Sequence, residues 1–280
     1  MRVVLIGAAL LAGLYVLGMG ALFVFQRRIL YHPDTNRPDL SRAEIPGARE
    51  VTIETPDGLS LLAWYLPPVR PDGFVALHLH GNAGHIGHRA WRLAPFARLG
   101  WGVLMPGYRG FGGNPGRPSE AGLLIDARAS LAAARAMGFS LDRILLWGES
   151  LGSGLAVRLA VDHEVAAVLL EAPYTSIAAM ARLRYKFVPV DSLLLDRFDS
   201  LSIVGRVRAP VLVMHGALDQ IIPLQMGRDL YRAAPDPKEL WIAPGAGHVD
   251  LVEAGAIEAA GDFVSRLRPH ELTDAAPASR

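Results

Sequence analysis

The 280-residue chain contains no cysteine, and its charges nearly balance, with 28 basic and 27 acidic residues. The lack of cysteine excludes cysteine nucleophiles, thiolate metal sites and disulfide bonds, but it leaves the cellular compartment open. Neither sign of charge forms a long run, so the sequence gives no reason to expect binding to nucleic acid. The length predicts one large domain with an additional element.

The additional element lies at the start of the chain. Residues 3–25 carry no charge and are bounded by Arg2 and by Gln26-Arg27-Arg28. As a helix, this run can cross a hydrocarbon core of about 30 Å. The alternatives are a cleaved signal peptide, whose apolar core is usually shorter, and a buried core helix. We expect a single-pass membrane anchor over residues 1–28, held in the lipid bilayer by residues 3–25, with the side of the catalytic domain undetermined.

The pattern after residue 48 alternates short apolar stretches with amphipathic ones. A turn at Pro56-Asp57-Gly58 predicts a hairpin. Strands are expected over 50–55, 59–66, 74–80, 101–105, 144–147, 165–170, 210–215 and 240–243, and helices over 90–99, 119–137, 153–160, 223–233 and 249–267. This order predicts an α/β fold with a mostly parallel eight-stranded sheet and helices on both faces.

Three segments depart from the alternation. Residues 29–47 contain three prolines and are expected to form an irregular linker before a domain at residues 48–269. Residues 172–209 are apolar and too long for an ordinary connection, so we expect a small cap over the strand ends. Ordinary packing against the sheet edge is the alternative for this segment. Residues 270–280 are expected to be a disordered tail.

The most informative motif is Gly148-Glu149-Ser150-Leu151-Gly152, between an expected strand and an expected helix. In that setting G-x-S-x-G is a nucleophile elbow, a tight turn that presents the serine at the top of the sheet. The glycines let the strand and the helix pass close together. Because a serine hydroxyl is a weak nucleophile at neutral pH, Ser150 needs a base and an acid that orients the base.

Position along the chain selects these partners, since the acid and then the histidine follow later strands in this architecture. His248 lies in a glycine-rich loop after the last expected strand and is the expected base. Asp219 follows the preceding strand and is the expected acid, although an aspartate there can also serve as a turn or N-cap residue. Glu171, directly after an earlier strand, is the competing acid.

The developing oxyanion of acyl transfer needs hydrogen-bond donors. The main-chain N–H of Leu151, directly after the nucleophile, is the first expected donor. The second is the main-chain N–H of Asn82, in the glycine turn His80-Gly81-Asn82-Ala83-Gly84 after an expected strand.

Four histidines near this turn raise the question of a metal site: His78, His80, His85 and His88. The first two share a strand face, and the last two would share a helix face. No carboxylate accompanies the cluster in the sequence, and the strand and turn account for His80. We therefore expect neither a metal nor a cofactor.

With these residues placed, the chain resembles the α/β-hydrolase superfamily, and most closely its Bem46-like group of membrane-anchored serine hydrolases. Leu30-Tyr31-His32-Pro33 after the apolar start is similar to that group, whereas Gly107 stands where similar sequences have an acidic residue. Other matching segments are His80–Gly84, Tyr108–Gly112, Gly116–Glu120, Gly148–Gly152, Asp196–Ser200, His215–Asp219 and Gly247-His248.

The residues and the resemblance together predict a serine hydrolase that cleaves carboxylic esters or thioesters through an acyl-enzyme. Its catalytic residues would be Ser150, Asp219 and His248, and its substrate a small molecule or acyl ester. A hydrolase of small peptides or amides on the same triad and a non-catalytic membrane scaffold are the alternatives. Acyl-chain length, leaving group and oligomeric state stay undetermined.

Overall fold

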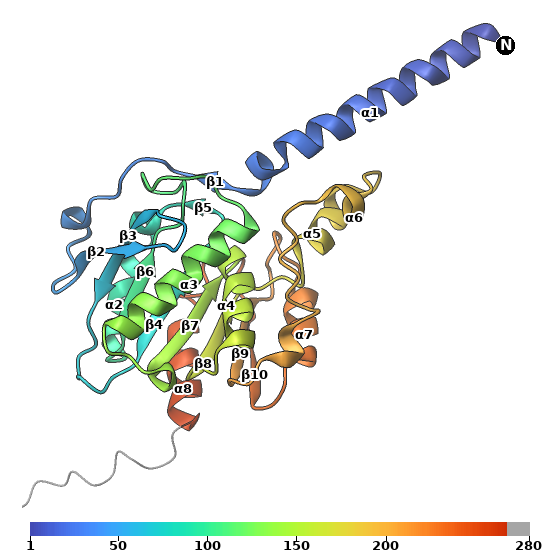
Figure 1. The fold of residues 1–280 in the computed structure, drawn as a ribbon. Helices are drawn as coiled ribbons and strands as arrows, with labels where there is room; N and C mark the ends of the chain where they lie inside the picture. The colour runs from blue at the N-terminus through green and yellow to red at the C-terminus, as the bar shows by residue number, and fades with distance from the viewer. Residues whose placement is uncertain (268–280) are drawn as a thin grey trace, which may run out of the picture.

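The computed structural model describes residues 1–267, so the tail expected over residues 270–280 lies outside the described residues. Its centre is a sheet of eight strands: β2 (Arg49–Glu54), β3 (Ser60–Leu66), β4 (Val75–Leu79), β6 (Gly102–Pro106), β7 (Ile144–Glu149), β8 (Ala167–Glu171), β9 (Val211–Gly216) and β10 (Lys238–Ala243). Their spatial order is β10-β9-β8-β7-β4-β6-β3-β2 (Figure 1). The predicted eight-stranded sheet is confirmed.

The sheet is mostly parallel, as predicted. The β2–β3 hairpin and the β3–β6 pair are antiparallel, and the pairs among the other strands are parallel. Every residue of β4, β6 and β8 is buried. Strands that are covered on both faces carry apolar residues at nearly every position, which explains the continuous apolar runs of the sequence.

Two layers of helices cover the sheet and give it two separate cores (Figure 1). One face packs against α3 (Glu120–Ala136), α4 (Leu151–Asp162) and α7 (Leu224–Ala233), and the other against α2 (Leu93–Arg98) and α8 (Ala256–Leu267). Along β4, Val75, Leu77 and Leu79 belong to the first core and Ala76 to the second. Side chains thus alternate between the two faces. Because these strands run parallel, their carboxyl ends lie at one edge of the sheet.

Two helices differ most from their predicted bounds. The helix expected over 249–267 begins only at Ala256, because turns occupy the residues before it and Gly255 adopts a φ of 104°. The helix expected over 90–99 is a 3-10 segment, η2 (Ile86–Arg92), followed by α2. Pro95 has no N–H to donate and is tolerated only in a first turn, which fits a regular helix that starts at Leu93.

The N-terminal helix α1 (Arg2–Leu30) extends two residues beyond the expected end of the anchor. It is apolar and long enough to span a membrane, a property that a signal sequence shares. Within residues 1–267, none of the α1 side chains is buried, unlike those of a core helix in a soluble domain.

The segment expected to be an irregular linker over 29–47 contains regular structure. Strand β1 (His32–Pro33) pairs in parallel with β5 (Ala83–Gly84), and the 3-10 helix η1 (Leu40–Ala43) follows. The pairing occurs because the glycine turn after β4 offers free main-chain groups to the extended residues that follow α1.

Residues 172–209, here called the cap segment, contain α5 (Ile177–Arg184), α6 (Val190–Leu193) and η4 (Val204–Arg206). In Figure 1, α5 and α6 stand beyond the strand ends on the same side as α1. Ser176 caps α5, since its hydroxyl accepts a hydrogen bond from the main-chain N–H of Ala179.

Candidate active site

Ser150 lies in the turn between β7 and α4 with a φ of 49°, a conformation that non-glycine residues rarely adopt. Its main-chain N–H donates to the main-chain oxygen of Glu171 across 2.9 Å, which holds the turn against β8. A Cβ atom on Gly152 would overlap the main-chain oxygen of Leu79, so only glycine lets α4 start this close to β4. Backbone strain maintained in this way is typical of functional positions.

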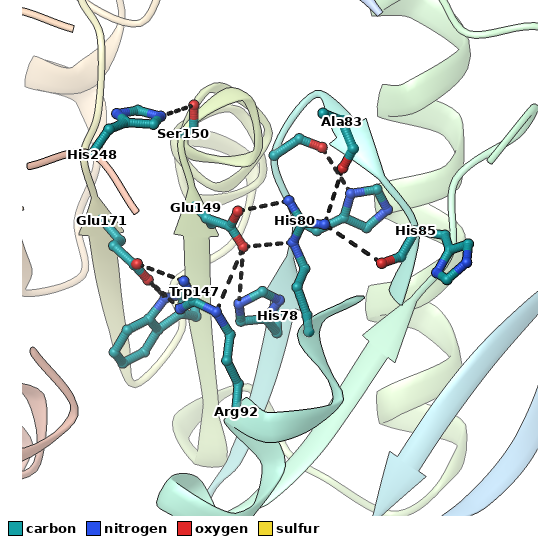
Figure 2. A network of polar contacts seen from close by, with 12 residues as sticks. His78, His80, Ala83, His85, Arg92, Trp147, Glu149, Ser150, Glu171 and His248 are labelled. Atoms are coloured by element: carbon teal, nitrogen blue, oxygen red, sulfur yellow. Dashed lines mark hydrogen bonds and ion pairs between the residues drawn. The ribbon is translucent and has the colours of Figure 1, made fainter. Parts of the chain in front are cut away.

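The three residues predicted from their order along the chain meet at one point. His248 Nε2 lies 3.1 Å from Ser150 Oγ, and His248 Nδ1 lies 2.8 Å from Asp219 Oδ2 (Figure 2 shows the His248–Ser150 pair). Because an ionised carboxylate only accepts, Nδ1 carries the ring hydrogen and Nε2 can accept the serine hydroxyl proton. The Asp219 side chain is fully buried, and 12% of the His248 side chain is exposed.

Asp219 uses its two oxygens for different purposes. Oδ1 accepts the main-chain N–H groups of Ile221 and Ile222 at 2.8 and 2.9 Å, which is the turn role considered from the sequence. Oδ2 faces His248. Burial alone would raise the pKa of Asp219, but hydrogen bonds from His215, His248 and Ile222 hold it well below its ordinary value.

His215 is a site residue that sequence reasoning did not assign, although it lies in the quoted segment His215–Asp219. It is fully buried at the end of β9, and its Nε2 lies 3.3 Å from Asp219 Oδ2 and 3.0 Å from the main-chain oxygen of Ile222. A carbonyl oxygen only accepts, so Nε2 carries the hydrogen and supports the acid. A histidine inside an apolar strand, four residues before an acid, was the available signal.

The competing acid, Glu171, is occupied elsewhere. Both of its oxygens accept from Arg92, at 2.7 and 2.9 Å, and Oε2 also accepts from Trp147 Nε1 at 2.7 Å (Figure 2). In the described part of the chain, Glu171 has no contact with His248. Burial would lower the pKa of Arg92, but Glu171 and Glu149 keep it above its usual value.

Glu149, the residue before the serine, extends this buried ionic network toward the glycine turn (Figure 2). It accepts two hydrogen bonds from Arg89, both of 2.8 Å, and a third Arg89 donor lies 3.0 Å from the oxygen of Ala83. Burial favours a raised pKa for Glu149, yet the charges of Arg89 and Arg92 hold it well below its usual range. The network therefore joins the elbow to the turn that contains Asn82.

The glycine turn is fixed from several sides. His80 Nδ1 lies 2.8 Å from the oxygen of Gly81, and the Tyr108 hydroxyl donates to the oxygen of His80 at 3.1 Å. Burial lowers the pKa of His80 to about 3, so its ring is neutral. The side chain of Asn82 donates to the main-chain oxygen of Leu30 at 2.7 Å, which directs this side chain toward α1.

Ser150 opens into a cavity of about 640 Å³, and His248 and both expected oxyanion donors, Asn82 and Leu151, also line it. This volume is typical of a site for a small molecule. The walls away from the serine are mainly apolar and come from α1 and the cap segment, through Leu22, Phe23, Ile29, Met180, Val188 and Leu194.

The histidine cluster differs from the expectation that no carboxylate accompanies it. Asp34 follows β1, and its Oδ2 lies 3.6 Å from Nε2 of both His85 and His88, whose rings stack at 3.9 Å. Among residues 1–267, these three side chains form the group that could hold a metal ion. His78 in β4 and His80 directly after this strand are buried instead, and burial lowers the pKa of both.

Comparison with known proteins agrees with this fold. The profile described as alpha/beta hydrolase fold matches residues 77–202. An uncharacterized protein of Mycobacterium tuberculosis (strain ATCC 25618 / H37Rv) is 41% identical over 228 residues, which cover 80% of this chain and 81% of the relative. The chain belongs to the α/β hydrolase superfamily. A further relative, the uncharacterized protein YfhR of Escherichia coli (strain K12), is 33% identical over 233 residues, with 79% of each chain covered.

Solved structures of lower identity share the α/β hydrolase fold. A Pyrococcus furiosus esterase, Pf2001, matches with a TM-score of 0.67 at 19% identity, over 84% of this chain and 98% of that chain. A Mycobacterium tuberculosis puromycin-hydrolyzing peptidase matches with a TM-score of 0.63 at 18% identity, over 79% of this chain and 39% of that chain. Because a protein named as an esterase and one named as a peptidase share this fold, the fold alone does not distinguish ester from amide substrates.

Proposed function

We propose that this chain is a membrane-anchored serine hydrolase that cleaves carboxylic esters or thioesters. The observation that carries the proposal is the hydrogen-bonded series Asp219–His248–Ser150, with distances of 2.8 and 3.1 Å, at the wall of an apolar cavity. A nucleophile, a base and an orienting acid in this geometry are what acyl transfer requires.

In the proposed reaction, Ser150 Oγ attacks the acyl carbon while His248 Nε2 takes the hydroxyl proton. The main-chain N–H groups of Leu151 and Asn82 stabilise the oxyanion of the tetrahedral intermediate. When this intermediate collapses, His248 gives the proton to the departing alcohol or thiol, which leaves an acyl-serine. Water, deprotonated by His248, then attacks the acyl-serine. As the carboxylic acid leaves, His248 returns the proton to Ser150 Oγ and the enzyme is restored.

The charge of Asp219 supports this proton movement. Because hydrogen bonds keep its pKa below the ordinary value, Asp219 stays ionised and stabilises the imidazolium that His248 becomes. His215 Nε2 lies 3.3 Å from Oδ2, the same carboxylate oxygen that binds His248, so it helps the acid to keep its orientation through both steps.

The Bem46-like resemblance and the division of the chain belong to the same proposal. We assign residues 1–28 as the membrane anchor, 29–47 as the linker, 48–269 as the hydrolase domain and 172–209 as its cap. The support is the apolar helix α1, which projects from the domain in Figure 1. The length and composition of this helix support the proposed membrane attachment.

Esters and thioesters are favoured over peptides by the cavity lining. Glu149 is the one acidic residue among the described residues that line the cavity, and its carboxylate already binds Arg89. These lining residues therefore offer no unpaired carboxylate to bind the amino group of a peptide. A kcat/KM for aminoacyl amides above that for esters would instead support the peptidase alternative.

The proposal is tested with Ser150→Ala and a matched control, Ser265→Ala, whose serine lies exposed on α8. We expect Ser150→Ala to lower p-nitrophenyl butyrate hydrolysis by about 10,000-fold or more and to abolish fluorophosphonate labelling. The control should keep both. Retained activity in Ser150→Ala would refute the mechanism, and an unlabelled wild-type chain would support the scaffold alternative.

A further inference from the structure

The base of α1 is fastened to the cap segment by side-chain hydrogen bonds. Gln26 donates to the oxygen of Leu193 at 3.1 Å and accepts the N–H of Leu195 at 2.8 Å. The next residue, Arg27, donates to the buried carboxylate of Asp196 at 2.9 and 3.2 Å. These bonds attach the helix to the domain at two consecutive positions, so the base of α1 has a fixed position relative to the cap segment.

The contact continues far along the helix. The hydroxyl of Tyr15 donates to the main-chain oxygen of Phe187 across 2.8 Å. Tyr15 precedes Arg27 by twelve residues, which corresponds to roughly 18 Å of helix. The connection between α5 and α6 therefore lies beside the apolar part of α1, not only beside its charged end (Figure 1).

The cap tip, defined here as residues 183–187, exposes apolar side chains beside α1. Phe187 is 88% exposed and Leu183 is 58% exposed. Arg184 and Lys186 alternate with them in the sequence. Apolar side chains that are exposed together mark an interaction surface, and cations beside them are typical of segments at a lipid headgroup layer.

The cavity that contains Ser150 lies between these two elements. Leu22, Phe23 and Ile29 of α1 form one wall, and Met180 and Val188 of the cap segment face the same space. The apolar surface of the cavity thus continues from the serine to residues of α1 that belong to the expected membrane span.

We propose that the substrate's long acyl chain lies in the bilayer and passes sideways between α1 and the cap tip to reach Ser150. The inference rests on the proposed function and names its substrate class: esters or thioesters of membrane-resident acyl chains. In this arrangement α1 is a wall of the acyl site as well as an anchor. The cap tip contacts lipid through the exposed side chains of Leu183 and Phe187.

Sideways passage is favoured over approach through water by the nature of the walls. Each methylene that leaves the hydrocarbon core for water costs free energy, and a chain that slides along Leu22 and Phe23 avoids this exposure. The leaving group would stay near the headgroups while the acyl carbon meets Ser150 Oγ.

The first test uses a substitution that narrows the cavity where α1 lines it. The protein is full length and is reconstituted in vesicles of non-hydrolysable ether lipids. Leu22→Trp places a larger side chain in the wall, and Leu14→Trp is the matched control at a 65% exposed position of the same helix. The readout is the ratio of kcat/KM for p-nitrophenyl palmitate to that for p-nitrophenyl butyrate.

We expect Leu22→Trp to lower this ratio at least about tenfold and Leu14→Trp to leave it at the wild-type value. An unchanged ratio in Leu22→Trp would overturn the inference while butyrate hydrolysis and fluorophosphonate labelling of the wild type still support the proposed function. A wild type without labelling would instead refute the proposed function itself. Dipalmitoyl lipid and an S-palmitoylated peptide, compared in the same vesicles, separate ester from thioester sources.

The second test locates the cap tip and uses the absence of cysteine from the chain. A single cysteine introduced as Phe187→Cys carries an environment-sensitive fluorophore, and Val69→Cys is the control at a 72% exposed position of the β3–β4 connection. Lipids brominated on the acyl chain should quench the probe at position 187 and not at 69. Equal quenching at the two positions, or no quenching at 187, would show that the cap tip does not contact lipid.

Discussion

The side chain of Asn82 donates a hydrogen bond to the main-chain oxygen of Leu30 across 2.7 Å. Leu30 is the last residue of α1, where a helix leaves its carbonyl oxygens without partners inside the helix. In return, the main-chain oxygen of Asn82 accepts the N–H of His32 at 2.9 Å. The turn that we propose as an oxyanion donor is therefore held by the end of the N-terminal helix.

We expect Asn82→Ala to lower kcat for p-nitrophenyl butyrate about tenfold, because the main-chain N–H remains but its position is held less firmly. The free energy of unfolding should fall by roughly 1 kcal/mol from the lost hydrogen bond. Steady-state kinetics and urea unfolding measure the two effects. The matched control is Asn36→Ala, whose exposed side chain donates to Asp34, two residues earlier in the chain. Wild-type kcat in Asn82→Ala would contradict this coupling.

Asp219 and Glu171 were the two candidates for the catalytic acid, and their contacts predict different effects of substitution. Asp219→Asn should lower kcat by about 10,000-fold, since a neutral amide neither orients His248 correctly nor stabilises its imidazolium. Glu171→Gln should instead lower the free energy of unfolding by about 3 kcal/mol, because it removes the nearer of the two carboxylates that balance the buried charge of Arg92.

The measurements are kcat of the folded protein and urea unfolding for each variant. Glu239→Gln is the matched control for the ion pair, because its partner Arg266 and Glu239 itself are both about half exposed. Exposed pairs contribute less than about 1 kcal/mol, so this control should be close to the wild type. A loss of kcat in Glu171→Gln as large as that in Asp219→Asn would reverse the assignment of the acid.

The site residues that can be predicted from the sequence are those that lie in short segments with a recognisable pattern. Ser150 is marked by its glycines, and His248 and Asp219 are marked by loops after strands, because chain order fixes their place in a parallel sheet. The bond between Arg89 and Glu149 joins positions 60 residues apart, and periodicity does not report which side chain faces which across such a distance.

Contacts between distant positions also explain the other differences between the predicted and the observed site. Asp34 meets His85 and His88 only because β1 pairs with β5, a two-residue contact too short to leave a pattern in the sequence. Likewise, the apolar run of α1 predicts its length but not that Leu22 and Phe23 face a cavity. That placement depends on hydrogen bonds from Gln26 and Arg27 to the cap segment, which are tertiary contacts.

Gly152 gives a prediction about the fold of the elbow. A methyl group there would overlap the oxygen of Leu79, which belongs to the rigid sheet and cannot move aside. We expect Gly152→Ala to lower the free energy of unfolding by at least about 3 kcal/mol and to reduce fluorophosphonate labelling. Gly245→Ala is the matched control, because an added Cβ at that position meets open space. Equal unfolding midpoints for the two variants would show that the close approach of α4 and β4 is not required.

The hydrogen bonds accepted by Asp219 also predict how stability depends on pH. In the folded chain the pKa of this carboxyl is depressed: burial alone would raise it, and the bonds from His215 and His248 more than offset that effect. In the unfolded chain the same group titrates near pH 4. Unfolding therefore takes up a proton below about pH 4, so the contribution of Asp219 is complete above this pH and is lost as pH falls toward the folded pKa.

We expect the free energy of unfolding to fall between about pH 5 and pH 3, and to fall less steeply in Asp219→Asn, which has no carboxyl to protonate. Ser150→Ala is the matched comparison, because it lacks the nucleophile but keeps the bond between His248 and Asp219. Its pH dependence should follow that of the wild type. Urea unfolding, monitored by tryptophan fluorescence at each pH, measures all three curves. Parallel curves for Asp219→Asn and Ser150→Ala would show that the carboxyl has the same pKa in the folded and unfolded chains, and that its hydrogen bonds do not favour the ionised form.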